Sequence, residues 1–353
     1  MSSKVVFPTQ SPAIIAVVIP TYRAKQTILK VISQIGPEVA FIYVIDDKCP
    51  EQSGNYVEQH CADPRVKVVR NETNQGVGGA TLAGYRAAAA DGASVIVKID
   101  SDAQMDPALI PFFVGPILRG EADYTKGNRF FNAYSLASMP RVRIFGNAAL
   151  SLITKFSTGY WNIFDPTNGY TAIHARLVSF LPGGDKISKR FFFETDLLYY
   201  LSMLRAVVVD IPIVACYGNE KSNLKAGSVL LPFLLAHVAR FFRRVLLHYF
   251  VRDFSFASLC AISGLPLFIF GILFGLANWV SHAAEGTATP IGTVMIASLA
   301  ILVGFQLILS FFSADMAFVP RQPVHILLDR QTLYPLAQFK EGIGQKHSKA
   351  VGF

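Results

Sequence analysis

The feature that most limits what this chain can fold into is a stretch of 61 residues, Phe254 to Ala314, whose one charged side chain is Glu285. Charged residues make up 16% of the whole chain, against about 25% in ordinary soluble domains. The stretch predicts two helices, Phe254–Val280 and Ile291–Ala314, each long enough to cross a hydrocarbon core of about 30 Å. Two buried core helices are the alternative, but uncharged runs this long are rarely that. We therefore expect a transmembrane hairpin at residues 253–315.

The formal net charge of +8 fits either a nucleic-acid partner or the positive-inside asymmetry of a membrane protein. Its distribution favours the membrane, because the loop Ser281–Pro290 between the two apolar helices has no Lys or Arg. Basic residues lie on both sides of the hairpin, at Arg240, Arg243, Arg244, Arg252, Arg321, Arg330, Lys340, Lys346 and Lys349. The apolar run Ile14–Pro20 is too short for a signal-peptide core. We expect a multi-pass protein of the plasma (inner) membrane, with both termini and the first domain cytoplasmic and no nucleic-acid partner.

Between residues 14 and 214, short runs rich in β-branched residues alternate with helical patterns. This alternation is typical of an α/β domain with a mostly parallel, Rossmann-like sheet, which we place at residues 1–226. The predicted strands are Ile14–Ile19, Phe41–Ile45, Val66–Val69, Ser94–Ile99, Tyr124–Lys126 and Val207–Val214. The predicted helices are Val77–Ala90, Pro107–Leu118, Arg143–Ser157 and Phe191–Leu204. Ligands of such sheets bind at the carboxyl ends of the strands, so polar residues there carry the most functional weight.

A third pattern covers Val229–Val251, which is apolar around most of its circumference. Its polar residues recur every three or four positions, at His237, Arg240, Arg244 and His248. This predicts a juxtamembrane amphipathic helix at residues 227–252 that lies in the headgroup plane, with its arginines against anionic lipid. The alternative is an ordinary amphipathic helix that packs on the globular domain. Residues 316–353 are expected to form a cytoplasmic tail.

The strongest chemical motif begins where the fourth predicted strand ends. Asp100 and Asp102 are separated by one residue, and the amide of Gln104 follows two positions later. Oxygen ligands at this spacing can converge on a hard divalent cation, Mg²⁺ or Mn²⁺, and leave positions open for a diphosphate. The alternative is a loop that caps the next helix, and this explains the pair Asp106-Pro107 well. It explains Asp100 and Asp102 poorly.

Weaker motifs end the first two strands and precede the first long helix. The paired acids Asp46-Asp47 and the segment Pro20-Thr21-Tyr22 could accept hydrogen bonds from a base or a ribose, although either motif alone is more often a turn. Gly76 opens a glycine-rich helix entry that lacks the spacing of a dinucleotide-binding motif and the lysine of a P-loop. We interpret it first as a tight turn near a nucleotide, with direct phosphate contact as the minor alternative.

The order of these motifs resembles the family-2 glycosyltransferases of GT-A fold, in particular the branch of dolichyl-phosphate mannose synthases and other polyisoprenyl-phosphate glycosyltransferases. The resemblance covers about residues 14–225. Further motifs that match this branch are Gly127-Asn128-Arg129-Phe130, Asp165-Pro166-Thr167-Asn168-Gly169-Tyr170, Phe193-Glu194-Thr195-Asp196 and Gly218-Asn219-Glu220-Lys221-Ser222. It implies inverting transfer of one sugar from a nucleotide sugar, expected to be UDP-linked, to a polyisoprenyl phosphate at the cytoplasmic face of the membrane.

The resemblance also implies roles for single residues. Asp100, Asp102 and Gln104 would hold the metal and the diphosphate. The nucleotide-sugar site would use Pro20, Tyr22, Asp46, Asp47, Gly76, Asp100, Glu194 and Lys221. The acceptor phosphate would meet Arg129, Arg143 and Asn147. The catalytic set would be Asp100, Asp102, Arg129 and Asp165.

Several assignments have open alternatives. Asp165 either orients the acceptor or a sugar hydroxyl, or caps the turn that follows it. Glu194 faces either sugar hydroxyls or basic residues, and Lys221 lies either in a closing loop or in a linker. A sugar transfer to a non-phosphate lipid or glycan would need a general base, for which Asp165 and Glu194 are candidates. A catalytically idle nucleotide-sugar-binding membrane protein is the rival class, and a homo-oligomer is left open.

Overall fold

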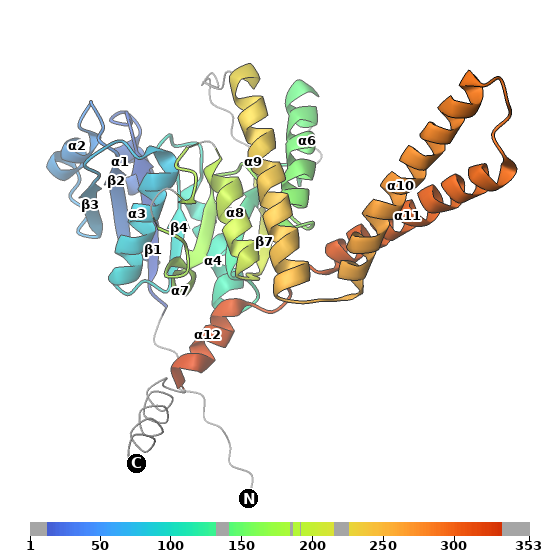
Figure 1. Ribbon diagram of the computed structural model, residues 1–353. Helices are drawn as coiled ribbons and strands as arrows, with labels where there is room; N and C mark the ends of the chain where they lie inside the picture. Colours follow the sequence, from blue (N-terminus) through green and yellow to red (C-terminus); the bar gives the residue numbers. More distant parts are fainter. Residues whose placement is uncertain (1–12, 132–140, 184–185, 191, 215–225, 334–353) are drawn as a thin grey trace, which may run out of the picture. The chain divides into compact units, whose positions relative to one another are not determined.

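The computed structural model describes residues 13–131, 141–183, 186–190, 192–214 and 226–333, with the backbone alone at residues 141–143, 226–230 and 329–333 (Figure 1). The chain divides into two compact units. The first unit takes in residues up to Ser151, then Asn162–Leu224, and the chain from Pro320 onward. The second unit consists of Leu152–Trp161 and Lys225–Val319.

The first unit is built on a seven-stranded sheet with the order β3-β2-β1-β4-β6-β5-β7. The strands are β1 (Ile15–Thr21), β2 (Val39–Asp46), β3 (Val66–Arg70), β4 (Val95–Lys98), β5 (Tyr124–Asn128), β6 (Thr171–His174) and β7 (Val208–Pro212). All six predicted strands are present, so the prediction of a mostly parallel α/β sheet is confirmed. The sequence analysis missed β6, because its sequence Thr-Ala-Ile-His contains no run of β-branched residues, unlike the equally short β4, Val-Ile-Val-Lys.

Strand β6 is the exception to the parallel arrangement, because it pairs antiparallel with both β4 and β5. Its amino end therefore lies at the edge where its neighbours have their carboxyl ends. The segment that leads into β6 consequently reaches the same edge as the loops after β1, β2, β4 and β5. This places Asp165–Tyr170 beside the acidic loops that the strand pattern had already assigned to that edge.

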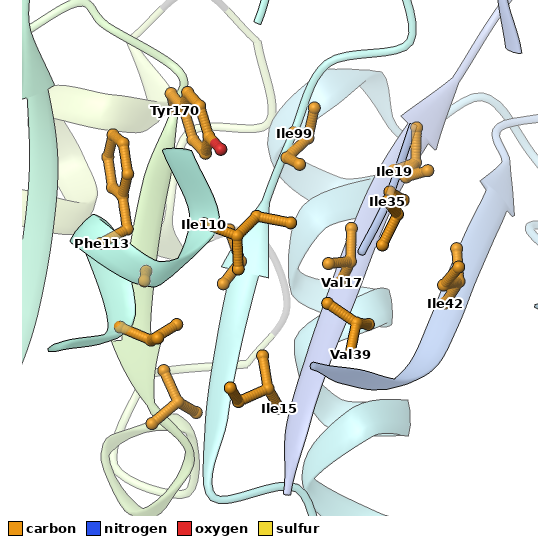
Figure 2. Packing of buried hydrophobic residues seen from close by; sticks show 14 of the residues in the cluster. Ile15, Val17, Ile19, Ile35, Val39, Ile42, Ile99, Ile110, Phe113 and Tyr170 are labelled. Atoms are coloured by element: carbon orange, nitrogen blue, oxygen red, sulfur yellow. The ribbon is translucent and has the colours of Figure 1, made fainter. Parts of the chain in front are cut away.

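Helices cover both faces of this sheet. They are α1 (Ile28–Ser33), α2 (Ser53–His60), α3 (Gly76–Ala90), η1 (Pro107–Leu109), α4 (Ile110–Leu118), α7 (Ala175–Val178) and α8 (Phe193–Met203). A further helix, α6 (Arg141–Thr158), begins in the first unit and ends in the second. One face carries an aliphatic cluster in which Val17 and Ile99 of the strand segments meet Ile110 and Phe113 (Figure 2). Alternate residues of a strand point to opposite faces, so Lys98 lies on the face away from this cluster.

The second unit contains α9 (Ala226–Leu246), a π-helical turn η3 (Leu247–Val251), α10 (Phe256–Ala284) and α11 (Ile291–Ala317). Helices α10 and α11 pack against each other and diverge toward the loop that joins them, so the predicted two-helix hairpin is present, while its crossing of a membrane stays a prediction (Figure 1). Glycines allow a close approach: a Cβ on Gly304 would lie 2.5 Å from the backbone nitrogen of Phe268, and one on Gly271 would lie 2.8 Å from that of Ile301. Small residues at the contact are typical of paired membrane helices.

The two hairpin helices expose most of their apolar surface. Only 17% and 22% of their most apolar 18-residue windows are buried, whereas a core helix of a soluble protein would be mostly buried. Large side chains such as Leu273, Trp279 and Leu302 are more than half exposed. By length and composition both helices could cross a bilayer. This indicates that the protein associates with a membrane.

Helix α9 corrects part of the amphipathic prediction. We expected its arginines to lie against lipid headgroups, but Arg244 is only 2% exposed, and His237 and His248 of the same stripe are buried as well. The outward face of the helix is apolar instead, with Leu235 and Phe242 at 60% and 64% exposure. Arg240 of the stripe is half-buried, and the three buried residues lie close to polar groups of the second unit; for example, His237 Nδ1 lies 2.8 Å from the hydroxyl of Ser157.

A buried ion pair explains the position of Arg244. Its guanidinium donates to both carboxylate oxygens of Asp315 near the end of α11, at 2.6 and 3.0 Å. The same carboxylate accepts a hydrogen bond from the hydroxyl of Tyr249 at 2.7 Å and from the indole of Trp161 at 2.9 Å. The carboxylate thus joins α9, η3, α11 and the segment after α6. A buried charge needs such pairing, because an isolated one would be very costly.

The predicted tail at residues 316–353 contains a helix, α12 (Val324–Leu333), that packs on the first unit. The carboxylate of Asp123 accepts hydrogen bonds from the backbone N–H groups of Val324 and His325 and from His325 Nδ1, at 2.7 to 2.8 Å. Asp123 is fully buried, and these bonds hold its pKa below the usual range although burial alone would raise it. The sequence pattern did not predict this helix.

We expect Asp315→Ala to destabilise the second unit by roughly 3–5 kcal/mol, because Arg244 would remain buried without its counter-ion. Thermal unfolding in detergent measures the loss. The double variant Arg244→Met/Asp315→Ala should regain most of the stability, since it removes both charges. A double variant as unstable as Asp315→Ala alone would show that the ion pair is not what holds these helices.

Candidate functional site

The site forms at the carboxyl ends of the parallel strands of the first unit. The loop after β4 carries Asp100, Asp102 and Gln104, all half-buried. Ala103 has a φ of 60°, which is uncommon for a residue other than glycine and turns the chain sharply. As a result the backbone N–H of Gln104 donates to Asp102 Oδ1 at 3.0 Å. The three predicted metal ligands therefore lie in one tight, accessible turn.

These three residues fit a hard divalent cation. They offer carboxylate and amide oxygens, the donors that Mg²⁺ and Mn²⁺ prefer. In the described part of the chain, no three or more His, Cys, Asp or Glu side chains gather into a metal cage. If this loop holds a cation, as we predicted, Asp100, Asp102 and Gln104 would supply part of its coordination shell, and a diphosphate and water would complete it.

Beneath this loop, Lys98 forms a buried ion pair that the sequence analysis did not predict. Its ammonium lies 2.6 Å from Asp100 Oδ1 and 3.9 Å from Glu194 Oε1. Burial alone would lower the pKa of Lys98, but the carboxylates of Asp100 and Glu194 outweigh burial and raise it. Burial raises the pKa of Glu194, with Lys98 and Lys126 opposing that effect. Of the two roles predicted for Glu194, the structure shows the one toward basic residues.

Lys126, on β5, is a second buried lysine. Burial lowers its pKa to about 8, although nearby carboxylates oppose the shift. Its ammonium donates to the backbone carbonyl of Asn168. Lys98 and Lys126 are both register partners of Thr171 on β6, so they lie on the same face of the sheet, on either side of Thr171. A lysine that ends an otherwise apolar strand was the signal that could have revealed Lys98, whereas β5, with the sequence Tyr-Thr-Lys-Gly-Asn, gives no such signal for Lys126.

Arg129 and Asp165 form a bidentate ion pair. Arg129 donates from Nε to Asp165 Oδ2 at 2.7 Å and from Nη2 to Oδ1 at 2.9 Å, and its backbone N–H donates to Oδ2 at 3.2 Å. Asp165 is fully buried, whereas the Arg129 side chain is 21% exposed. The two residues were predicted separately, and the antiparallel course of β6 brings them together. Asp165 acts on Arg129 as well as on the turn that follows, where Thr167 Oγ1 lies 3.4 Å from Asp165 Oδ1.

Asp46 and Asp47 are both buried and both hold turns. Asp46 accepts the backbone N–H groups of Cys49 and Gly54, each at 2.7 Å. Asp47 accepts the backbone N–H groups of Gln75 and Gly76 at 2.8 and 2.7 Å, which ties the end of β2 to the start of α3. Both residues therefore stabilise turns, which was the alternative role that we gave for them. Nucleotide contact stays a prediction for them.

Gly76 is a tight turn, as the sequence predicted first. Its φ is 73°, a conformation that favours glycine, and a Cβ would lie 2.4 Å from the carbonyl oxygen of Lys189. Its N–H donates to Asp47 and so does not point to a phosphate in this structure. At the end of β1, Pro20 is buried in the sheet, while Tyr22 is 45% exposed with Arg23 over its ring.

The predicted acceptor residues are described unevenly. Asn147 is half-buried in α6, and Arg143 lies in the same helix with only its backbone described. Lys221 lies outside the described residues. Whether Arg143 and Asn147 converge with Arg129 therefore stays a prediction.

The chain was compared with known protein families, with named relatives and with solved structures. Residues 16–180 match the family described as Glycosyl transferase family 2. The chain contains a family 2 glycosyltransferase domain. It is therefore a glycosyltransferase, and together with its sheet this identifies the GT-A fold that the motifs predicted.

Two named relatives are similar along most of their length. The chain is 27% identical over 216 residues to the undecaprenyl-phosphate mannosyltransferase of Micrococcus luteus, covering 60% of this chain and 88% of that one. It is 26% identical over 234 residues to the UDP-N-acetylglucosamine–dolichyl-phosphate N-acetylglucosaminyltransferase of Methanococcus voltae, covering 62% and 92%.

One similar solved structure is glucosyl-3-phosphoglycerate synthase from Mycobacterium tuberculosis in complex with Mn²⁺, UDP-glucose and phosphoglyceric acid. It has 22% sequence identity and a TM-score of 0.48, covering 66% of this chain and 79% of that one.

Asp210 of β7 is a further titratable group near the site that the sequence did not reveal. It accepts hydrogen bonds from Asn128 Nδ2 at 2.8 Å and from the backbone N–H of Phe164 at 3.0 Å, and burial raises its pKa to about 6. A raised folded-state pKa gives stability that is complete below the unfolded pKa of about 4 and is lost as the pH rises through about 6.

We expect Asp210→Asn, which cannot ionise, to be more stable than the natural chain by up to about 3 kcal/mol at pH 8 and by only about 1 kcal/mol at pH 4.5. Thermal unfolding at the two pH values measures this. Asp123→Asn is the control of opposite sign, because the pKa of Asp123 is lowered and its charge stabilises the fold at pH 8. Equal effects of Asp210→Asn at both pH values would contradict the assignment.

Proposed function

We propose that this protein transfers a single sugar from a nucleotide sugar, UDP-linked by preference, to a polyisoprenyl phosphate at the cytoplasmic face of the membrane. The observation that carries the proposal is the pairing of Asp165 with Arg129 beside the acidic loop, in a chain with two exposed apolar helices. The two relatives named above differ in sugar but share a polyprenol-type phosphate acceptor by name. The acceptor class is therefore better supported than the sugar.

The state of Asp165 argues against the alternative with a non-phosphate acceptor. A hydroxyl acceptor would need a general base. Asp165 is fully buried, and both its oxygens accept hydrogen bonds from Arg129, so this candidate base is already engaged. A phosphate monoester, with a second pKa near 6, is largely dianionic at neutral pH and can attack without being deprotonated. The site then needs to position and neutralise the two anionic partners.

The residues divide this work between them. Asp100, Asp102 and Gln104 would hold a divalent cation, Mg²⁺ or Mn²⁺, which when bound supplies positive charge that stabilises the departing diphosphate. Asp165 fixes the guanidinium plane of Arg129, whose exposed edge would bind the acceptor phosphate. Because the Arg129–Asp165 pair is neutral overall, Arg143 would contribute the net positive charge for the acceptor, with Asn147 as a further donor.

Attack of the acceptor oxygen on the anomeric carbon, in line with the departing diphosphate, would invert that carbon. The remaining residues of the predicted donor site, Pro20, Tyr22, Asp46, Asp47 and Lys221, would surround the nucleotide. Glu194 would act through Lys98 and not directly on the sugar, because it lies within 3.9 Å of that ammonium.

The membrane helices would bring the enzyme to its acceptor. We propose that the exposed apolar face of α9, with Leu235, Phe242 and Leu246, lies in the acyl boundary while its buried polar stripe faces protein. This reverses the orientation we predicted for Arg244. With the hairpin spanning the bilayer, both termini and the catalytic domain would be cytoplasmic.

Asp102→Ala should lower sugar transfer by on the order of a hundredfold or more, because the loop loses one of its two accessible carboxylates. Membranes are incubated with radiolabelled UDP and GDP sugars, and the lipid-linked product is extracted and counted. Asp106→Ala is the matched control on the same loop: its side chain accepts the N–H of Ala108 at the helix start, so we expect about 1 kcal/mol less stability and retained transfer. Undiminished transfer by Asp102→Ala would contradict the assignment of this loop as the metal and diphosphate site.

Arg143→Ala should weaken use of the lipid phosphate by roughly tenfold or more and leave nucleotide binding nearly unchanged, since a charged hydrogen bond to phosphate is lost. Titrating each ligand separately measures the two effects. Arg141→Ala is the matched control, because residues two apart on a helix point in different directions. Equal losses for both ligands would contradict an acceptor role. Absence of both transfer and nucleotide-sugar hydrolysis in the natural chain would favour the idle binding protein instead.

A further inference from the structure

The loop proposed to hold a metal ion already has a cation bonded to it. Lys98 is 2% exposed and lies on the sheet directly beneath the loop. Its ammonium is 2.6 Å from Asp100 Oδ1, so one of the two accessible carboxylates is shared between the interior and the site. Glu194, at 3.9 Å, is the second acidic neighbour of the ammonium.

The surrounding chain leaves room for this contact and for little else. A Cβ on Gly169 would lie 2.5 Å from the Lys98 ammonium and 2.7 Å from Asp100 Oδ2. Tyr85, fully buried in α3, closes the same region and places its hydroxyl 3.4 Å from Thr171 Oγ1, beside the register position of Lys98. The ammonium is therefore held in place by packing on several sides, and it cannot move far from Asp100.

A fixed ammonium on a metal ligand has an electrostatic consequence. A bare divalent cation at Asp100 and Asp102 would be repelled by Lys98 at short range in a partly buried site. A divalent cation together with a nucleoside diphosphate is close to neutral or negative, so the same ammonium repels that complex little or attracts it. The charge of Lys98 thus disfavours binding of the bare cation more than binding of the cation with its nucleoside diphosphate.

We propose that Lys98 is a positioning residue that makes binding of the divalent cation depend on the nucleotide. It holds Asp100 in place and disfavours the bare ion, so that cation and nucleoside diphosphate enter the site together. This inference rests on the proposed function, because it presumes a site for a metal ion and a nucleoside diphosphate at this loop. In this proposal the charge of Lys98 makes the site select the ion with its nucleotide over the bare ion. Glu194 contributes through its contact with Lys98.

The test measures binding and not transfer. Full-length protein in detergent is titrated with Mn²⁺, and free Mn²⁺ is followed by electron paramagnetic resonance with and without UDP, and in parallel with GDP. In the natural chain we expect weak binding of Mn²⁺ alone and much tighter binding with nucleotide. Lys98→Met should bind Mn²⁺ alone roughly tenfold tighter, while binding with nucleotide changes less, so the enhancement by nucleotide shrinks.

Lys126→Met is the matched control. Lys126 is as buried as Lys98 and is a register partner of the same Thr171. Its ammonium donates to the backbone carbonyl of Asn168, whereas the ammonium of Lys98 contacts Asp100. Lys126→Met should leave the affinity for Mn²⁺ alone within about threefold of the natural value. If Lys98→Met does not fold, Lys98→Met/Glu194→Gln removes the buried charge together with its neighbour, and the same gain in affinity is expected.

Three outcomes are decisive. A folded Lys98 variant that binds Mn²⁺ alone no more tightly than the natural chain overturns the inference and leaves the proposed function standing. An equal gain in Lys126→Met also overturns it, because the effect would then not come from contact with Asp100. Failure of the natural chain to bind Mn²⁺ with either nucleotide overturns both the inference and the proposed metal-dependent function.

Discussion

The antiparallel insertion of β6 between β4 and β5 is the constraint on which the site depends. In a purely parallel sheet, the segment before β6 would enter at the opposite edge, away from the acidic loops. Because β6 runs the other way, its entry segment delivers Asp165 to Arg129 and Gly169 to Lys98 and Asp100. The same strand supplies Thr171 as the shared neighbour of the two buried lysines.

Paired charges in buried positions recur in both units and tie distant segments together. In the first unit Arg129 pairs with Asp165, and the buried carboxylate of Asp123 accepts hydrogen bonds from His325 of the last described helix. In the second unit Arg244 meets Asp315. Each pair satisfies charges whose burial alone would be unfavourable, and each joins residues of different elements. Removing one partner would leave the other buried and uncompensated, so these contacts define how the elements assemble more than they add net stability.

Much of the fold followed from the sequence because its signals are local and periodic. β-branched runs predicted six of the seven strands, and long uncharged runs predicted the hairpin. Acids directly after a strand predicted which loops form the site, since the carboxyl ends of parallel strands share an edge. Strand β6 was missed because its sequence Thr-Ala-Ile-His contains no run of β-branched residues. Helix α12 was missed because its docking depends on Asp123, about 200 residues earlier. The prediction that Arg244 of α9 lies against lipid headgroups was wrong, because Arg244 is buried in the second unit. Periodicity shows that a helix has a polar stripe, but it does not show what that stripe contacts.

The sequence by itself determined the classes of residues available: the oxygen ligands of the loop after β4, an arginine after β5, and two helices apolar enough to enter a membrane. It also determined that Asp46, Asp47 and Gly76 lie at the site edge. The tertiary structure alone decided how those groups share their charges. It assigned Asp165 to Arg129, Glu194 to Lys98, and Asp47 to the backbone N–H groups of Gln75 and Gly76. The reason is physical: hydrogen bonds and ion pairs act over a few ångströms, and only the packed chain brings residues far apart in sequence within that range.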